Sequence, residues 1–372
     1  MQKIVIAGAG IAGCSAAYEL AKRGCTVTVI DRADTGRATD AAAGIICPWL
    51  SQRRNQDWYR LVRLGARHYG GLIAELEQLG EKETGYRKVG ALQLYSDEAK
   101  RDKAYERALA RREEAPEIGD IEKVDTYQIA KLYPPAAAGY AGLHVSGAAR
   151  VDGRKLLQAL RRAAEHHGAE FIAGNAQLEN DGSGTLRIQV DGRLYTADRL
   201  IWATGAWPPD FESLGLELAV RGQKAQIVHL DPHEEQAKDW PVVIPPGDQY
   251  LLSFDDGRVA AGATHEDDDV FNPSVSAGGI REVLDKALDV APGLRHAEWV
   301  GARTGVRPFT PGFLPVAGEV PEHPGMYIIN GLGASGLTAG PFIGKLLAQI
   351  CTGEETDADM APYAPDSAIH AH

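Results

Sequence analysis

One arginine in this sequence has no acidic residue close after it that could pair with its positive charge. Arg307 lies in the segment TGVRPFTPGFLPVAG, residues 304–318, among glycine, proline and apolar side chains, and the first acidic residue after it is Glu319. A guanidinium keeps its proton, and burying one without a partner costs several kcal/mol. We therefore expect Arg307 to meet an anionic ligand. A structural salt bridge is the alternative, and Arg303 is the competing candidate for the ligand.

A second group of residues has the spacing of a nucleotide site. Gly8, Gly10 and Gly13 form a Gly-x-Gly-x-x-Gly pattern, and an acid, Asp31, follows. In such a motif the first glycine permits a tight turn, the second lets a pyrophosphate approach the backbone, and the third lets helix and strand pack closely. The pyrophosphate would lie at the helix N-terminus, and Asp31 would accept hydrogen bonds from ribose hydroxyls. The motif alone does not choose between NAD and FAD.

The elements that must hold this motif are predicted by the pattern around it. Residues 4–7 are a short apolar run typical of a buried parallel strand, and residues 11–23 carry apolar side chains at helical spacing before Gly24. Residues 26–30 predict a second strand that ends on Asp31. Strand, helix and strand together predict a dinucleotide-binding βαβ unit of an α/β protein.

Two further segments favour FAD over NAD. Residues 31–49 supply small residues and hydroxyls instead of the next βαβ crossover that an NAD domain would need. Near the other end of the chain, Gly331, Gly333 and Gly336 precede an apolar helix within residues 330–350. Glycines at helix starts allow close backbone approach to a ligand, and an NAD domain alone would leave these glycines without a role.

Length, charge and cysteine usage limit the remaining possibilities. The 372 residues predict two domains, and the net charge of −12, with no basic run longer than a pair, argues against nucleic acid as a partner. The four cysteines form no Cys-x-x-Cys pair, so neither a metal site nor a disulfide framework is indicated. We expect a cytoplasmic protein, because the sequence shows no signal peptide and no run of 18 apolar residues. A homo-oligomer is left open.

The middle of the chain is expected to bind substrate. Residues 224–264 predict antiparallel strands with a hairpin at Asp256-Gly257, and alternation places Tyr250, Leu252 and Phe254 on one face. Residues 49–144 predict helices and loops, including a solvated charged helix within residues 96–120. His265 lies in the loop beyond the second strand, either lining the same cavity or simply exposed.

With these segments the chain resembles the D-amino-acid oxidase superfamily of FAD enzymes, most of all its bacterial glycine oxidase and D-amino-acid dehydrogenase branch. The similarity runs nearly the whole length and includes residues 147–171, 199–207 and 330–350. A Gly-x-x-Thr-Ser segment with a further glycine is matched by Gly36, Thr39 and Gly44, and the pattern Arg-Pro-x-Thr-x-Asp-x-x-Pro-x-x-Gly by Arg307, Pro308, Thr310, Pro315 and Gly318. The chain departs from these patterns at Asp40, where serine is common, and at Gly312, where aspartate is usual.

The resemblance implies an FAD-binding Rossmann-like domain interleaved with an α+β substrate domain built on an antiparallel sheet. The implied division is 1–48, 145–212 and 305–368 for FAD, with 49–144 and 213–304 for substrate. Arg307 and Tyr250 would hold the substrate carboxylate, and no metal is expected. Motifs and resemblance together assign cofactor contacts to Gly8, Gly10, Ile11, Ala12, Gly13, Asp31, Arg32, Ala38, Thr39, Ala43, Gly44, Ile45, Gln177, Gly205, Arg307, Leu332, Gly333, Ala334, Ser335, Gly336, Leu337 and Thr338.

The implied activity is oxidative deamination of a small amino acid, either a D-amino acid or glycine. Hydride would pass from Cα to flavin N5, giving an imino acid and then an oxo acid. Oxidation of secondary amines such as sarcosine is one alternative, and an NAD-dependent dehydrogenase and a non-catalytic nucleotide-binding protein are others. The electron acceptor is O2, a membrane quinone or a protein. We expect non-covalent FAD, because relatives with a covalent link use a cysteine near Arg307 or a histidine in the early loop. Gly305 stands in the first region here, and residues 32–46 contain no histidine.

Overall fold

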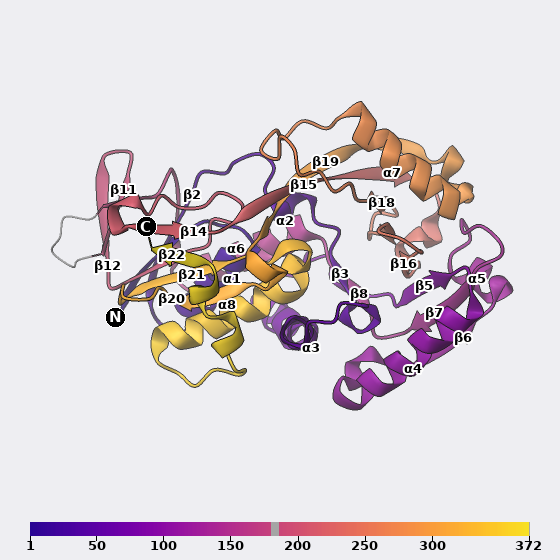
Figure 1. The fold of residues 1–372 in the computed structure, drawn as a ribbon, viewed down its shortest axis with the longest axis horizontal. Helices are drawn as coiled ribbons and strands as arrows, with labels where there is room; N and C mark the ends of the chain where they lie inside the picture. Colours follow the sequence, from indigo (N-terminus) through magenta and orange to yellow (C-terminus); the bar gives the residue numbers. More distant parts are fainter. Residues whose placement is uncertain (180–185, 372) are drawn as a thin grey trace.

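The computed structural model describes residues 1–179 and 186–371, and its first sheet is parallel apart from one edge strand (Figure 1). The predicted strand–helix–strand unit is present, with α1 (Ile11–Lys22) joining β1 (Lys3–Ala7) to its parallel neighbour β2 (Thr26–Asp31). In spatial order the sheet consists of β20 (Val316–Glu319), β21 (Met326–Asn330), β13 (Arg199–Trp202), β1 (Lys3–Ala7), β2 (Thr26–Asp31) and β9 (Glu170–Ala173).

Both faces of this sheet are covered, which explains why its strands are continuous apolar runs. Ile4 and Ile6 pack with the helices on one face, whereas Val5 and Leu200 pack on the other face with Ile188 of a small antiparallel sheet. The helices are α1, α6 (Gly153–His166) and α8 (Gly336–Thr352), and the small sheet consists of β10 (Gln177–Glu179), β11 (Leu186–Val190) and β12 (Arg193–Ala197). The α/β class predicted from the sequence is confirmed.

The second sheet has eight strands and pairs mostly antiparallel. It contains the predicted hairpin, in which Gly257 N donates to the carbonyl of Phe254. In spatial order its strands are β19 (Glu298–Phe309), β15 (Arg221–Asp231), β18 (Val259–Gly262), β17 (Tyr250–Ser253), β16 (Val242–Ile244), β5 (Ala91–Tyr95), β7 (Ala141–Val145) and β6 (Ile121–Val124).

The expectation of only helices and loops in residues 49–144 was wrong. Three strands of the large sheet, β5, β7 and β6, come from this segment. All five residues of β5 are buried, so its sequence ALQLY shows no alternation of polar and apolar side chains. The helices that the segment does contain are α3 (Gln56–Gln78), α4 (Glu98–Glu114) and α5 (Thr126–Leu132).

The large sheet faces a helix on one side and the first sheet's domain on the other. Helix α7 (Ala277–Val290) packs through Val283 against Val228 and Val259. The opposite face meets the short helix α2 (Ala38–Ala41), where a Cβ on Gly305 would lie 2.9 Å from that of Ala41. The remaining strands are β3 (Ile45–Ile46), β4 (Arg87–Lys88), β8 (Ala149–Arg150), β14 (Leu216–Leu218) and β22 (Ile369–Ala371).

Two elements lie across the predicted division into domains. Strand β19 runs through residue 305, where the third FAD-binding segment was expected to begin, and α3 packs against α8 although it belongs to the segment assigned to substrate. The division itself remains a prediction. Among the described helices none is long and apolar enough to cross a membrane.

Candidate functional site

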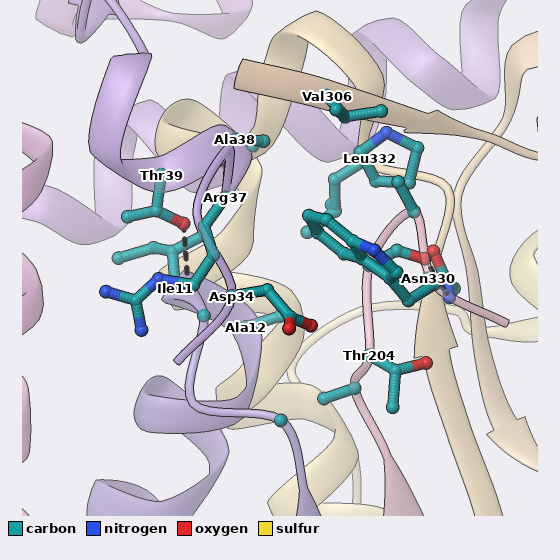
Figure 2. Close-up of a pocket in the computed structure, with 18 of the residues that line it drawn as sticks. Ile11, Ala12, Asp34, Arg37, Ala38, Thr39, Thr204, Val306, Asn330 and Leu332 are labelled. Atoms are coloured by element: carbon teal, nitrogen blue, oxygen red, sulfur yellow. Dashed lines mark hydrogen bonds between the residues drawn. The ribbon is translucent and has the colours of Figure 1, made fainter. Parts of the chain in front are cut away.

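A cavity of about 800 Å³ lies between the two sheets (Figure 2). Asp31 and Gln177 line it from the first domain, and Tyr250 and Arg307 line it from the large sheet. Of the residues predicted from the sequence, only Gly13 and Ser335 are not part of the lining. The predicted residues that line it are Gly8, Gly10, Ile11, Ala12, Asp31, Arg32, Ala38, Thr39, Ala43, Gly44, Ile45, Gln177, Gly205, Tyr250, Arg307, Leu332, Gly333, Ala334, Gly336, Leu337 and Thr338.

The three motif glycines have different surroundings. A Cβ on Gly8, which has a φ of +106°, would lie 2.3 Å from the carbonyl oxygen of Ala203, and one on Gly13 would lie 2.0 Å from that of Gly8. A Cβ on Gly10 would meet nothing closer than Thr39 Oγ1 at 3.7 Å. Gly8 and Gly13 are therefore needed for packing between strand and helix, whereas Gly10 leaves room on the cavity side.

Asp31 is held in place by main-chain donors. Its Oδ2 accepts a hydrogen bond from Ala9 N at 2.6 Å, and its Oδ1 accepts one from Ala33 N at 2.7 Å. Arg37 Nη1 lies 3.4 Å from Oδ1. A carboxylate oxygen has two lone pairs, so Oδ2, which accepts one hydrogen bond, retains acceptor capacity for a ribose hydroxyl, whereas Oδ1 already accepts two. Arg37 and Asp34, which sequence reasoning missed, also line this part of the cavity and are labelled in Figure 2.

The two helices that begin at the cavity lack side-chain caps. At α3 to α7 the N-cap side chain accepts a hydrogen bond from the first turn, and these N-cap residues are Asn55, Asp97, Asp125, Asp152 and Ser276. By contrast, the N-cap residues of α1 and α8 make no such bond and their first turns contain no acidic residue, although Ile11 N of α1 donates to Thr39 Oγ1 at 3.2 Å. Uncapped N–H groups and the positive end of the helix dipole favour negative charge, so both N-termini suit a ligand with anionic groups.

Small residues of neighbouring strands lie at the end of the cavity that contains Arg307 and Tyr250. We call this end the substrate end, because the sequence predicted substrate to bind there, and we call these small residues its floor. Strand register pairs Gly305 with Ala225, and Tyr250 with Gly262, which in turn pairs with Ile227. A Cβ on Gly262 would lie 2.7 Å from Tyr250 Oη, so the tyrosine ring crosses over this glycine toward β15.

Arg307 and Tyr250 stand beside this floor and interact with each other. Burial lowers the pKa of Arg307, and a hydrogen bond with Tyr250 partly offsets the effect. Burial also raises the pKa of Tyr250 to about 12, against the opposing influence of Arg307. Within residues 1–179 and 186–371, Arg307 forms no ion pair with a carboxylate. The guanidinium is therefore available to an anion in the cavity.

The competing arginine, Arg303, lies near two other arginines, Arg154 and Arg258. It is not among the lining residues, and burial lowers its pKa to about 10, with further contributions from Arg154 and Arg258. Register places it four residues from Arg307 on the same strand, opposite Ile227. The geometry thus favours Arg307 over Arg303 as the arginine that meets a ligand in this cavity.

Sequence reasoning missed several lining residues because their position depends on contacts between distant segments. Thr204, Val306 and Asn330 line the cavity, as Figure 2 shows. The side chain of Asn330 donates to the carbonyl of Gly205 at 2.9 Å and accepts from Gly331 N at 2.7 Å. This residue fixes two of the glycine turns, and its place at the end of an apolar strand was the only signal in the sequence.

Comparison with known proteins identifies the family. The model of the FAD dependent oxidoreductase family (DAO) matches residues 3–350. The chain belongs to this family. It is 53% identical over 99% of its length to all of the uncharacterized oxidoreductase YurR of Bacillus subtilis, and 27% identical to the glycine oxidase of Geobacillus kaustophilus, covering 97% of this chain and 96% of that one.

Solved structures agree with this assignment. The iminodiacetate oxidase of Chelativorans sp. BNC1 has a TM-score of 0.93 and 42% identity, covering 97% of this chain and 98% of that one. The glycine oxidase structure from Geobacillus kaustophilus has a TM-score of 0.87 and 25% identity, covering 98% of both chains. The protein is an FAD-dependent oxidoreductase that acts on amino acids or amines.

The residues of the cavity fit FAD. The space beside Gly10, the carboxylate of Asp31 and the two uncapped helix N-termini suit the pyrophosphate, a ribose and an electron-rich ring edge. FAD would extend from these groups toward Tyr250 and Arg307, which line the same cavity. When bound, its isoalloxazine ring supplies the hydride acceptor, and the chain's own residues supply binding and orientation.

Proposed function

We propose that the protein oxidises the Cα–N bond of glycine or of an N-substituted glycine. The observation that supports this most directly is Arg307, a guanidinium that lines the cavity beside Tyr250 and has no carboxylate partner among the described residues. Its planar fork offers two parallel N–H donors, which bind a carboxylate in a defined orientation. Tyr250 keeps its proton because its pKa is about 12, so it can donate a third hydrogen bond.

The floor limits the size of the substrate. Helix α2 packs against Gly305 through Ala41, and the Tyr250 ring occupies the space above Gly262, so little room is left there for a substrate side chain. A carboxylate held above this floor would place its Cα close to the cofactor, and orientation of this kind accounts for much of the catalysis. The similarity to glycine oxidases and to an iminodiacetate oxidase supports a glycine-type substrate with a primary or secondary amine.

Neither Tyr250 nor Arg307 is suited to remove a proton from the substrate amine. Tyr250 stays protonated and Arg307 stays cationic over the neutral range. The amine must therefore be neutral when it reacts, and we expect kcat/KM to rise with pH until the free amine predominates. The product would be an imine, which water hydrolyses.

We further propose that FAD is bound without a covalent link and that O2 is the electron acceptor. Neither cysteine nor histidine is among the residues that line the cavity in the described part of the chain, so no side chain of the usual kind is available for flavin attachment. The names of the relatives, which are oxidases, support O2. Acid precipitation should leave the yellow flavin in the supernatant, and a yellow pellet after washing would contradict the proposal.

The substrate is tested by anaerobic reduction of the bound flavin. We expect glycine or N-methylglycine to bleach the flavin absorbance, with D-alanine as a comparison for side-chain tolerance, while NADPH leaves it oxidised. The expectation for NADPH follows from the single nucleotide motif, which FAD would occupy. Rapid reduction by NADPH, with no response to any amino acid, would overturn the proposed function.

A further inference from the structure

His265 shares the face of the large sheet that carries Arg307. The neighbouring Glu266 forms an isolated antiparallel bridge with Lys224 of β15, and its side chain contacts Lys224 and Gln226 on the side where α7 packs. Because side chains alternate along an extended segment, the preceding His265 points to the opposite face. Along β15 this is the face of Ala225, which lines the cavity.

Two small residues separate His265 from Arg307. Ala225 lies between His265 on one neighbouring segment and Gly305 on the other, and Arg307 is two residues from Gly305. Two strand spacings correspond to roughly 10 Å between backbones, and both long side chains shorten that gap. His265 is not part of the cavity lining, and 41% of its side chain is exposed. It therefore forms the outer rim of the substrate end.

The charged groups around His265 define what the imidazole can bind. Its Nδ1 lies 3.6 Å from Oδ2 of Asp248, which directs the ring, and Lys286 Nζ neutralises that carboxylate at 3.2 Å. Burial lowers the pKa of His265, and the positive charge of Arg307 lowers it further, while Asp248 partly offsets both effects. On α7, Lys286 also lowers this pKa and Glu282 raises it. The imidazole is thus neutral near pH 7, with Nε2 directed away from Asp248.

We propose that His265 is a specificity-determining residue that binds a second carboxylate, carried on the amine substituent of the substrate. This inference rests on the proposed function, in which Arg307 holds the α-carboxylate. The preferred substrate class is then N-(carboxyalkyl)glycines, secondary amines with an anionic group at each end. Ala225, whose side chain is a single methyl group, lies between the two binding groups on the same face of the sheet.

Binding of a dicarboxylate should be coupled to proton uptake. A carboxylate close to the imidazole favours its charged form, so the pKa of His265 rises when the dianion binds. Because the pKa of His265 is higher in the complex than in the free protein, its protonation strengthens binding at low pH. This contribution disappears as the pH rises through the pKa that His265 has in the complex. A monocarboxylate that contacts only Arg307 should show no such dependence over the neutral range.

Two ether ligands test this without titration of a substrate amine. Diglycolate has two carboxylates, methoxyacetate has one, and neither has a nitrogen. Their dissociation constants for the holoenzyme would be measured by perturbation of the flavin absorbance from about pH 5.5 to about pH 9. We expect diglycolate to bind roughly fivefold to tenfold more tightly at the acidic end than at the alkaline end, with a flat profile for methoxyacetate.

Variants assign the effect to the imidazole. His265→Gln should abolish the pH dependence for diglycolate and leave methoxyacetate binding unchanged, while His233→Gln, an exposed histidine at the far end of β15, should behave like the unmodified protein. Equal pH profiles for the two ligands, or a diglycolate profile that survives in His265→Gln, would overturn the role of His265. Failure of both ligands to perturb the flavin would instead contradict the proposed function.

Discussion

The nucleotide end of the cavity is built mainly from main-chain groups, whereas the substrate end is built from side chains above a floor of small residues. At the first end, Ala9 N and Ala33 N hold Asp31, and two helix N-termini are left without caps. At the second end, Arg307 and Tyr250 interact across β15 and β18, and the tyrosine ring lies over Gly262. Substitutions should therefore affect binding of the cofactor at one end and turnover at the other.

The two ends of the cavity also differ in how far apart in the sequence their residues lie. The nucleotide end uses a glycine turn and an acid that are close in sequence and joined by one helix. At the substrate end, Tyr250 of β17 reaches Arg307 of β19 only because β18 and β15 lie between them in register. Substitutions at each end therefore show how independent the two ends are.

The largest effect should follow Arg307→Ala. The variant loses both donors to the substrate carboxylate in a partly buried site, so we expect kcat/KM to fall by about 10²–10³-fold, or about 2–4 kcal/mol. Flavin content should be unchanged, because the nucleotide end is held by other groups. Steady-state kinetics and the ratio of flavin to protein absorbance measure both quantities.

Two controls make the result specific. Arg307→Lys should recover only part of the loss, since an ammonium cannot reproduce the planar fork. Arg303→Ala, on the same strand but outside the lining, should have a much smaller effect on kcat/KM. A yellow Arg307→Ala protein with normal kcat and KM would show that the arginine serves the fold rather than the substrate.

Asp31→Asn addresses the other end of the cavity. The amide keeps the shape of the carboxylate but replaces one acceptor oxygen with a donor facing a backbone N–H, so we expect the dissociation constant for FAD to rise about 10-fold to 100-fold. In protein saturated with FAD, KM for the amino acid should change little. A matched variant is Asp34→Asn, whose carboxylate pairs with Arg32 and holds no part of the glycine turn. A large loss of turnover in flavin-saturated Asp31→Asn would show that the two ends are coupled.

The nucleotide end could be predicted from the sequence because its determinants are local. Gly8 and Asp31 stand in one segment whose hydrophobic periodicity predicts strand, helix and strand, and both line the cavity, while Gly13 packs against Gly8.

The substrate end could be predicted only in part. Alternation placed Tyr250, Leu252 and Phe254 on one face, but no local pattern reveals that Gly262 lies beneath the tyrosine or that Ala225 lies next to Gly305. Such neighbours depend on strand register over long separations in sequence. The strands from residues 91–145 were missed for a related reason, because full burial of β5 removes the alternation that marks a strand.

Gly262→Ala tests the floor of the substrate end. The added methyl group would lie 2.7 Å from Tyr250 Oη and 2.6 Å from Ile227 Cγ2, so the tyrosine must move. We expect about a tenfold loss in kcat/KM, mostly in KM, because displacement of a positioning group is costly. Gly71→Ala in α3, where a methyl group meets nothing within 4 Å, is the control. If Gly262→Ala costs as much in a Tyr250→Phe background as alone, the effect does not act through the tyrosine hydroxyl.

The smallest effect should follow Tyr250→Phe. One hydrogen bond to the substrate carboxylate is lost while Arg307 remains, which corresponds to about 0.5–1.5 kcal/mol, or about a 2-fold to 12-fold fall in kcat/KM. Burial raises the pKa of Tyr250 to about 12, so the hydroxyl stays protonated and the phenolate forms only as pH rises through that value. The pH profile of kcat/KM below pH 10 should therefore have the same shape in the variant as in the unmodified protein. Loss of the ascending limb of the profile in Tyr250→Phe would mean that this tyrosine transfers a proton, and the substrate end would then contribute acid–base chemistry as well as binding.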